Sequence, residues 1–108
     1  MKPTKLRVVV FQEGDWLCAQ CLEYDFGTQA RNLEDLLSDL QRIIVGHVAI
    51  CRENGLKPFT AVRRAPKKYW TMFRQSKISL PPRTFRFSIN RRGFRLSPPE
   101  IRVAPLVA

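Results

Sequence analysis

Cysteine, histidine and long apolar runs are scarce in this sequence of 108 residues. Three cysteines form no dense disulfide framework, and their odd number favours reduced thiols in a reducing compartment. No apolar run approaches the roughly 20 residues that a membrane-spanning helix requires. The apolar run that begins at Val8 is too short for a signal peptide. We therefore expect a cytoplasmic protein with no membrane partner.

The few metal-ligating side chains do not indicate a zinc site. Cys18 and Cys21 form a C-x-x-C, and His47 and Cys51 are the remaining candidates to complete a zinc site with them. Residues three apart in a strand point to opposite faces, so we interpret these cysteines as small core residues. A redox role is disfavoured because a thioredoxin-like C-x-x-C opens a helix. We predict no metal and no cofactor.

Acidic residues suited to catalysis are also few. Glu23 and Asp25 are two apart and point the same way on a strand, as paired carboxylates in a metal-dependent nuclease would. Such a site needs further acidic ligands, and the other acids lie in a turn or on the exposed face of a predicted helix. His47 is the single histidine and falls on an apolar stripe, with no clear nucleophile beside it. We predict that the protein is not an enzyme.

Charge is divided unevenly along the chain, whose formal net charge is +10. Residues 1–60 carry seven Lys and Arg and eight Asp and Glu, whereas residues 61–108 carry twelve Lys and Arg and one acid, Glu100. This asymmetry predicts a nearly neutral module at 1–60 and a basic extension at 61–108. The extension could face a polyanion or an acidic patch on a partner.

One amphipathic helix is the clearest periodic signal. Asn32 is a suitable N-cap, with Asp35 three residues later, and Asn54-Gly55 is suited to close the helix. The spacing of three and four residues places an apolar stripe on one face. The stripe comprises Leu33, Leu36, Leu37, Leu40, Ile43, Ile44, His47, Val48 and Cys51.

Three β-rich segments precede this helix, at residues 6–11, 16–22 and 26–30. They predict an α+β fold in which a three-stranded antiparallel meander packs on the long helix. The second face of the middle strand, with Cys18 and Leu22, is also fairly apolar. Either the C-terminal segment or another subunit should cover it, and we expect a homo-oligomer.

The basic extension has weaker signals. Pro66 suits the first position of a helix, and we expect a short helix at 66–76. Alternation at Phe85, Phe87 and Ile89 predicts a strand at about 83–90, and we expect it to form a β-hairpin with extended chain at about 94–107.

Residues 5–60 carry a motif. Ala19, Cys21, Leu22, Glu23 and Asp25 are followed by Thr28-Gln29 and by Leu33-Glu34 with Leu36. This pattern resembles the HicB-like family, the antitoxin half of HicAB toxin–antitoxin pairs. The resemblance implies a partial RNase H-like fold and a non-catalytic protein that occludes a HicA-like toxin, as an antitoxin or an orphan relative. We take Trp16, Glu23 and Asp25 as candidate partner-binding residues.

The basic extension also suggests a second function, nucleic-acid binding. Its cations are interleaved with aromatic residues, and clustered Lys and Arg neutralise phosphates while exposed rings stack on bases. The alternative is that the rings belong to the core and the charges solvate the surface. The candidate nucleic-acid-binding residues are Arg63, Arg64, Lys67, Lys68, Arg86, Arg91, Arg92 and Arg95.

Overall fold

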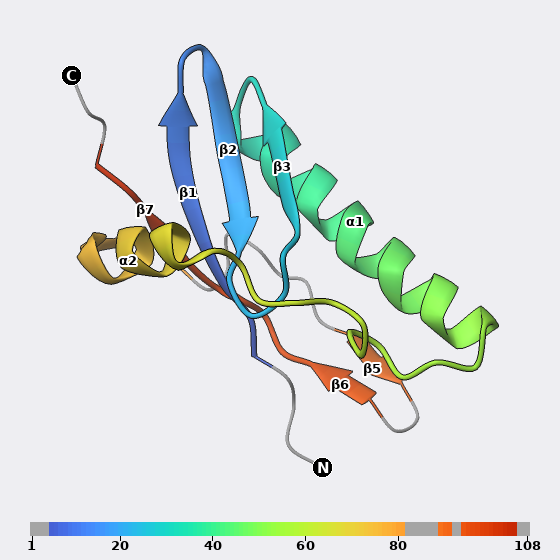
Figure 1. Ribbon diagram of the computed structural model, residues 1–108. Coiled ribbons are helices and arrows are strands. Elements are labelled where there is room, and N and C mark those ends of the chain that lie inside the picture. The colour runs from blue at the N-terminus through green and yellow to red at the C-terminus, as the bar shows by residue number, and fades with distance from the viewer. Residues whose placement is uncertain (1–4, 82–88, 92–93, 106–108) are drawn as a thin grey trace.

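A computed structural model of the protein describes residues 5–81, 89–91 and 94–105. Helices and strands follow one another along the chain (Figure 1). In order they are β1 (Arg7–Glu13), β2 (Trp16–Cys21), β3 (Gly27–Ala30), α1 (Leu33–Glu53), α2 (Lys67–Gln75), β4 (Ile78–Ser79), β5 (Ile89–Arg91), β6 (Phe94–Leu96) and β7 (Glu100–Val103).

The main sheet is mixed and has five strands in the order β3-β2-β1-β7-β4, so the predicted α+β class is confirmed. β1 pairs antiparallel with β2, and β2 pairs antiparallel with β3. The predicted sheet of three strands is too small, because β7 lies parallel to β1 with Val8 opposite Ile101. β4, which the sequence did not predict, pairs antiparallel with β7 at the edge. One sheet therefore combines strands from both sides of residue 60.

β5 and β6 form a second, two-stranded sheet. They pair antiparallel, with Ile89 opposite Leu96 and Arg91 opposite Phe94. The extended segment predicted at 94–107 is divided between two sheets, since β6 belongs to this hairpin and β7 to the main sheet. Pro98 and Pro99 lie between the two strands, and neither can donate a backbone hydrogen bond to a ladder. Residues 83–88 of the strand predicted at about 83–90 lie outside the described residues.

Both ends of α1 are formed as the sequence predicts. The side chain of Asn32 accepts a hydrogen bond from the backbone N–H of Asp35 at 2.8 Å, which caps the first turn. At the other end Gly55 has φ +68°. The N–H of Leu56 donates to the carbonyl of Cys51, and that of Gly55 to the carbonyl of Arg52. This pair of bonds is a Schellman motif, so the helix ends where a left-handed residue is available.

The apolar stripe of α1 packs on one face of the sheet. Leu36, Leu40 and Ile44 are fully buried, together with Val8 and Val10 of β1. Alternation along β1 sends Val9 to the opposite face, where it packs with Phe73 of α2. α1 and α2 thus cover opposite faces of the sheet (Figure 1). The C-terminal segment covers the second apolar face, one of the two alternatives that the sequence left open. Neither helix of the described chain is long and apolar enough to cross a membrane.

Candidate functional site: a basic and aromatic face

The predicted basic segment and the first strand meet around the indole ring of Trp70. The guanidinium carbon of Arg64 lies 4.2 Å from the ring centroid, and that of Arg7 lies 4.7 Å from it. On the preceding residue of α2, Nζ of Lys68 lies 4.9 Å from the ring centroid of Tyr69. We call this surface the basic–aromatic face and define it by Arg7, Arg63, Arg64, Lys67, Lys68, Tyr69 and Trp70.

Packing of α2 against the sheet positions this face. Phe73 is buried with Val9, Leu22 and Ala65, and it anchors the helix. Tyr69 and Trp70, four and three residues before Phe73, are only partly buried on the same side of α2. The side of the helix that anchors it therefore continues outward into the aromatic rings of the face.

The first turn of α2 carries cations where a helix prefers anions. Pro66 is the N-cap and makes no side-chain cap hydrogen bond, and the first turn contains Lys67 and Lys68 with no acidic residue. Positive charge at the positive end of the helix dipole is unfavourable by several tenths of a kcal/mol per charge. The cations are thus retained at a local cost in stability, and a bound anion would relieve that cost.

The ion pair between Glu23 and Arg7 fixes one of the two guanidinium groups over Trp70. The carboxylate of Glu23 accepts hydrogen bonds from the backbone N–H of Arg7 at 2.7 Å and from its Nε at 2.6 Å. The Glu23 side chain is 20% exposed and that of Arg7 is 42% exposed. Glu23 therefore acts as a support for the basic–aromatic face.

Asp25 supports the same face through the loop before α2. Its backbone N–H donates to the carbonyl of Arg63 at 2.8 Å. Its carboxylate accepts a hydrogen bond from Nε2 of Gln20 at 2.9 Å and lies 3.6 Å from Nε of Arg63. The Arg63 side chain is 88% exposed, so its charge stays accessible. Of the two carboxylates predicted to bind a partner, Asp25 thus contacts Arg63, a member of the predicted nucleic-acid set, and Glu23 contacts Arg7, which was not in that set.

Trp16, the third candidate partner-binding residue, is placed apart from this cluster. It begins β2, whereas Glu23 and Asp25 follow the end of that strand. Trp16 is 38% exposed, and the guanidinium carbon of Arg31 lies 4.1 Å from its ring centroid. The structure therefore separates Trp16 from the two carboxylates by the length of β2.

No family model, curated protein or solved structure matches this chain.

For the remaining predicted cations, the structure does not describe the side chains. Arg86 and Arg92 are outside the described residues. Arg91 and Arg95 fall in β5 and β6, of which the structure describes the backbone course but not these side chains. Arg7 is the member of the face that sequence reasoning missed. It shares the alternation of Val9 and Phe11 in β1, which was the available signal that it lies on the α2 side.

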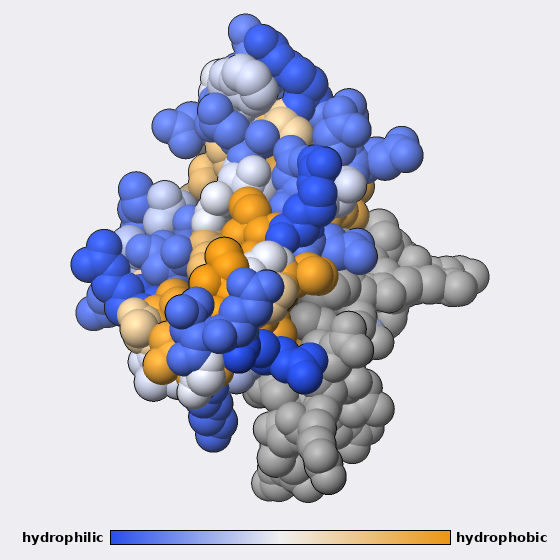
Figure 2. All heavy atoms as spheres, turned by 90° about the vertical axis from the view of Figure 1, so that its right-hand side faces the viewer, coloured by the Kyte–Doolittle hydropathy of each residue, from blue (hydrophilic) through white to orange (hydrophobic). Residues whose placement is uncertain are grey.

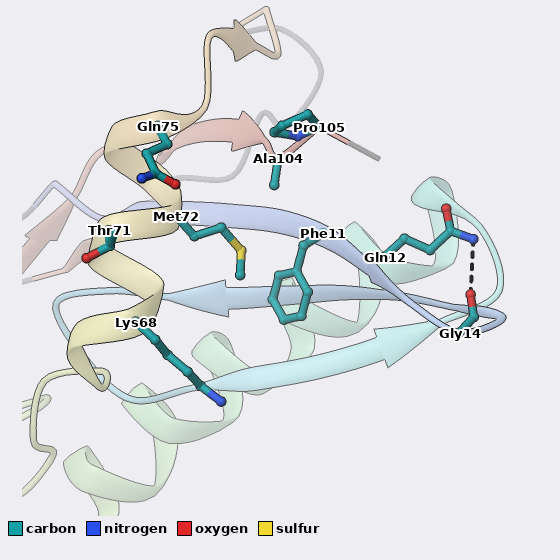
Figure 3. A pocket seen from close by; sticks show the side chains of 9 residues that line it. All are labelled: Phe11, Gln12, Gly14, Lys68, Thr71, Met72, Gln75, Ala104 and Pro105. Atoms are coloured by element: carbon teal, nitrogen blue, oxygen red, sulfur yellow. Dashed lines mark hydrogen bonds between the residues drawn. The ribbon is translucent and has the colours of Figure 1, made fainter. Parts of the chain in front are cut away.

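A pocket of about 730 Å³ adjoins the face, between the end of β1 and α2. Figure 3 shows the ring of Phe11 and the side chain of Met72 directed toward the same space, with Lys68 at its border. Gln12 lines the pocket and donates through Nε2 to the carbonyl of Gly14 at 3.1 Å. The pocket's volume is within the range of small-ligand sites. The pocket has an apolar floor and a cation, Lys68, at its border.

The three cysteines are buried, and His47 is hydrogen-bonded within the fold. Cys18, Cys21 and Cys51 are buried free thiols, and burial raises the pKa of Cys21 to about 12. Nε2 of His47 accepts a hydrogen bond from the backbone N–H of Phe59 at 3.1 Å and lies 3.5 Å from Sγ of Cys51. Among the described residues, no group of three or more His, Cys, Asp or Glu side chains could hold a metal ion.

Proposed function

We propose that the protein acts by binding, without turnover, and that the basic–aromatic face binds the phosphate backbone and bases of a nucleic acid. The observation that carries this proposal is the arrangement at Trp70, with two guanidinium groups over its ring at 4.2 and 4.7 Å. Guanidinium groups bind phosphates in a bidentate way, and the partly exposed rings next to them offer π-faces on which bases stack.

The acidic residues near the face support binding rather than catalysis. Glu23 is held by Arg7, and Asp25 is engaged by Gln20 and Arg63. A carboxylate that serves as a metal ligand or general base has to be presented to a substrate. These two instead hold cations and a loop in place, a role that a binding surface requires.

A fluorescence-anisotropy titration with a labelled single-stranded oligonucleotide tests the proposal. Each phosphate neutralised on a single strand contributes about −0.7 to the slope of log K against log salt. With three to five cations engaged, we expect a slope of roughly −2 to −3.5 between about 50 and 200 mM salt. Arg64→Gln should weaken binding severalfold and reduce the slope by about 0.7.

Lys57→Gln is the matched control, because it removes one positive charge from the loop after α1, outside the face. It should change the affinity much less than Arg64→Gln does. Absence of binding at low salt, or equal effects of the two variants, would refute the proposal. Tighter binding of duplex than of single-stranded oligonucleotides would support the phosphate contacts of the proposal and would refute base stacking on the rings.

A second candidate function is that of a HicB-like antitoxin or orphan relative that occludes a HicA-like toxin. The observation in its favour is the order β-β-β-α, with antiparallel pairs β1–β2 and β2–β3 followed by α1 along one face. This order is consistent with the partial RNase H-like type that the sequence resemblance implies.

Co-purification with a HicA-like ribonuclease encoded next to this chain tests the antitoxin function. We expect a stable complex in which ribonuclease activity is lost, and Trp16→Ala should weaken it because Trp16 is an exposed aromatic anchor. Free toxin activity at saturating concentrations of this protein would exclude this function and would leave the nucleic-acid proposal intact.

A further inference from the structure

The outward face of α1 is apolar over its second half, although it lies opposite the buried stripe. Val45 is 43% exposed and Ile50 is 62% exposed, and Ala49 is also exposed. With Gly46 these residues occupy positions i, i+1, i+4 and i+5, which are neighbours on one helix surface. Figure 2, viewed from the side of the molecule that carries α1, shows apolar residues gathered among hydrophilic ones. A helix face open to water is ordinarily polar, and no described part of the chain covers this apolar surface.

Charged residues of opposite sign flank the apolar surface at its two ends. Arg42 lies one turn before Val45, and its side chain is 75% exposed beside Asp39, with which it forms an ion pair. Glu53 lies one turn after Ala49 and is exposed. Each end of the apolar surface therefore carries both signs, Asp39 with Arg42 at one end and Arg52 with Glu53 at the other. A surface of this kind is complementary to itself when it is turned by 180°.

We propose that a second copy of this chain covers the surface, with the two α1 helices antiparallel about a two-fold axis. We place the axis between His47 and Val48. Residues at equal distances before and after this point, such as 46 and 49, then lie opposite each other in the two copies. Val45 then faces Ile50 of the other copy, and Gly46 faces Ala49. The same register places Arg42 opposite Glu53. Apolar, small and oppositely charged residues all match in this one arrangement.

Gly46 provides the space that this packing needs. A Cβ built at Gly46 would meet nothing within 4 Å, so the described residues leave room for a side chain or a partner directly above it. A glycine inside a helix costs roughly 1 kcal/mol relative to alanine, and a close helix contact is a reason to tolerate it. Two helices that meet at Gly46 and Ala49 can approach toward the shorter end of the ~8–10 Å range of packed helices.

The expected dimer is weak and reversible. A helix of 21 residues is about 30 Å long, and one of its faces buries less than the roughly 800 Å² per partner of a standard interface. We expect a dissociation constant on the order of 10 μM, which corresponds to a monomer–dimer equilibrium that shifts with concentration. This inference does not depend on nucleic-acid or toxin binding, because the basic–aromatic face lies on α2 across the sheet.

Sedimentation velocity of the full chain from about 1 to 500 μM tests the dimer, with variants at the axis and the flanks. Gly46→Gln adds a helix-favouring side chain that clashes with nothing in the monomer. It should keep or raise the melting temperature and yet abolish the dimer. Arg42→Glu and Glu53→Arg should each weaken association by about tenfold, and the double variant should restore it.

Ile78→Gln serves as the control, since Ile78 is 60% exposed on β4, away from α1. It should leave the dissociation constant unchanged. A wild-type protein that stays monomeric throughout would overturn the proposal, as would a dimer insensitive to Gly46→Gln. Loss of the dimer in Ile78→Gln, or no recovery in the double charge variant, would equally assign association to another surface.

Discussion

Phe59 donates its backbone N–H to Nε2 of His47 across 3.1 Å, and the two rings stack with centroids 5.1 Å apart. Tyr24 also stacks on Phe59, with a centroid distance of 4.2 Å. Phe59 has φ +68°, an uncommon conformation for a residue with a large side chain. The hydrogen bond and the stack hold the loop after α1 in this conformation, which directs the chain toward α2.

The burial of His47 makes the free energy of unfolding depend on pH. Burial lowers the pKa of His47 below its usual value near 6.5, so the unfolded chain binds the proton more tightly. The free energy of unfolding should be insensitive to His47 above about pH 6.5 and should fall as the pH drops below it. Urea unfolding of wild type and His47→Gln between about pH 8 and 5 measures this difference. Equal pH dependence in the two proteins would show that His47 is not the responsible group.

Replacement of Glu23 by Gln should loosen Arg7 from Trp70. The variant keeps the size of the side chain but removes the charge that binds Arg7 at 2.6 Å. Because Arg7 is 42% exposed, solvent screening limits the expected loss of stability to about 1 kcal/mol or less. In a Trp16→Phe background the fluorescence of Trp70 should change, since one cation leaves its ring. An unchanged spectrum together with unchanged stability would contradict a supporting role for Glu23.

The parts of the fold that sequence could predict are those set by nearby residues. The N-cap of α1 involves Asn32 and Asp35, three residues apart, and its C-terminal motif is fixed by Gly55. The parallel pairing of Val8 with Ile101 joins residues more than 90 positions apart, and no local signal encodes it. β7 contains two apolar and two charged residues. Its sequence alone therefore gives only a weak β-strand propensity, and its pairing with β1 decides that it is a strand.

The candidate site likewise has a part set by nearby residues, which the sequence predicts, and a part set by distant ones, which it does not. Arg63, Arg64, Lys67 and Lys68 are consecutive enough to be recognised as a basic cluster. Their relation to Arg7 and Glu23 depends on how β1 and α2 pack, which sequence spacing does not contain. The carboxylates were predicted to bind a partner, and the structure places them against arginines of the same chain.

Charge reversal at Lys67 should separate stability from binding. Lys67→Glu places an acid in the first turn of α2, where it interacts favourably with the helix dipole. We expect a gain of about 0.5 kcal/mol in the free energy of unfolding and a loss of oligonucleotide affinity. Lys57→Glu carries the same charge change away from the face and should do neither to a similar extent. Destabilisation by Lys67→Glu would show that the lysine is structurally favourable where it is.

Two glycines should respond oppositely to the same substitution. A Cβ at Gly46 or at Gly55 meets nothing within 4 Å, so steric contact does not distinguish them. Gly46→Ala in the helix interior should stabilise the protein by about 1 kcal/mol. Gly55→Ala should destabilise it by about 1 kcal/mol, because Gly55 has φ +68°. Chemical denaturation measures both, and a shift of the same sign in the two variants would contradict the assigned conformations.

The indole N–H signals of the two tryptophans provide the most direct test of the central claim, that nucleic acid binds the basic–aromatic face. Trp70 lies within that face, and Trp16 lies at the opposite end of β2 under Arg31. In a ¹⁵N–¹H titration with a single-stranded oligonucleotide at low salt, the Trp70 signal should shift progressively while the Trp16 signal stays in place. A shift of Trp16 with Trp70 unchanged would contradict the account.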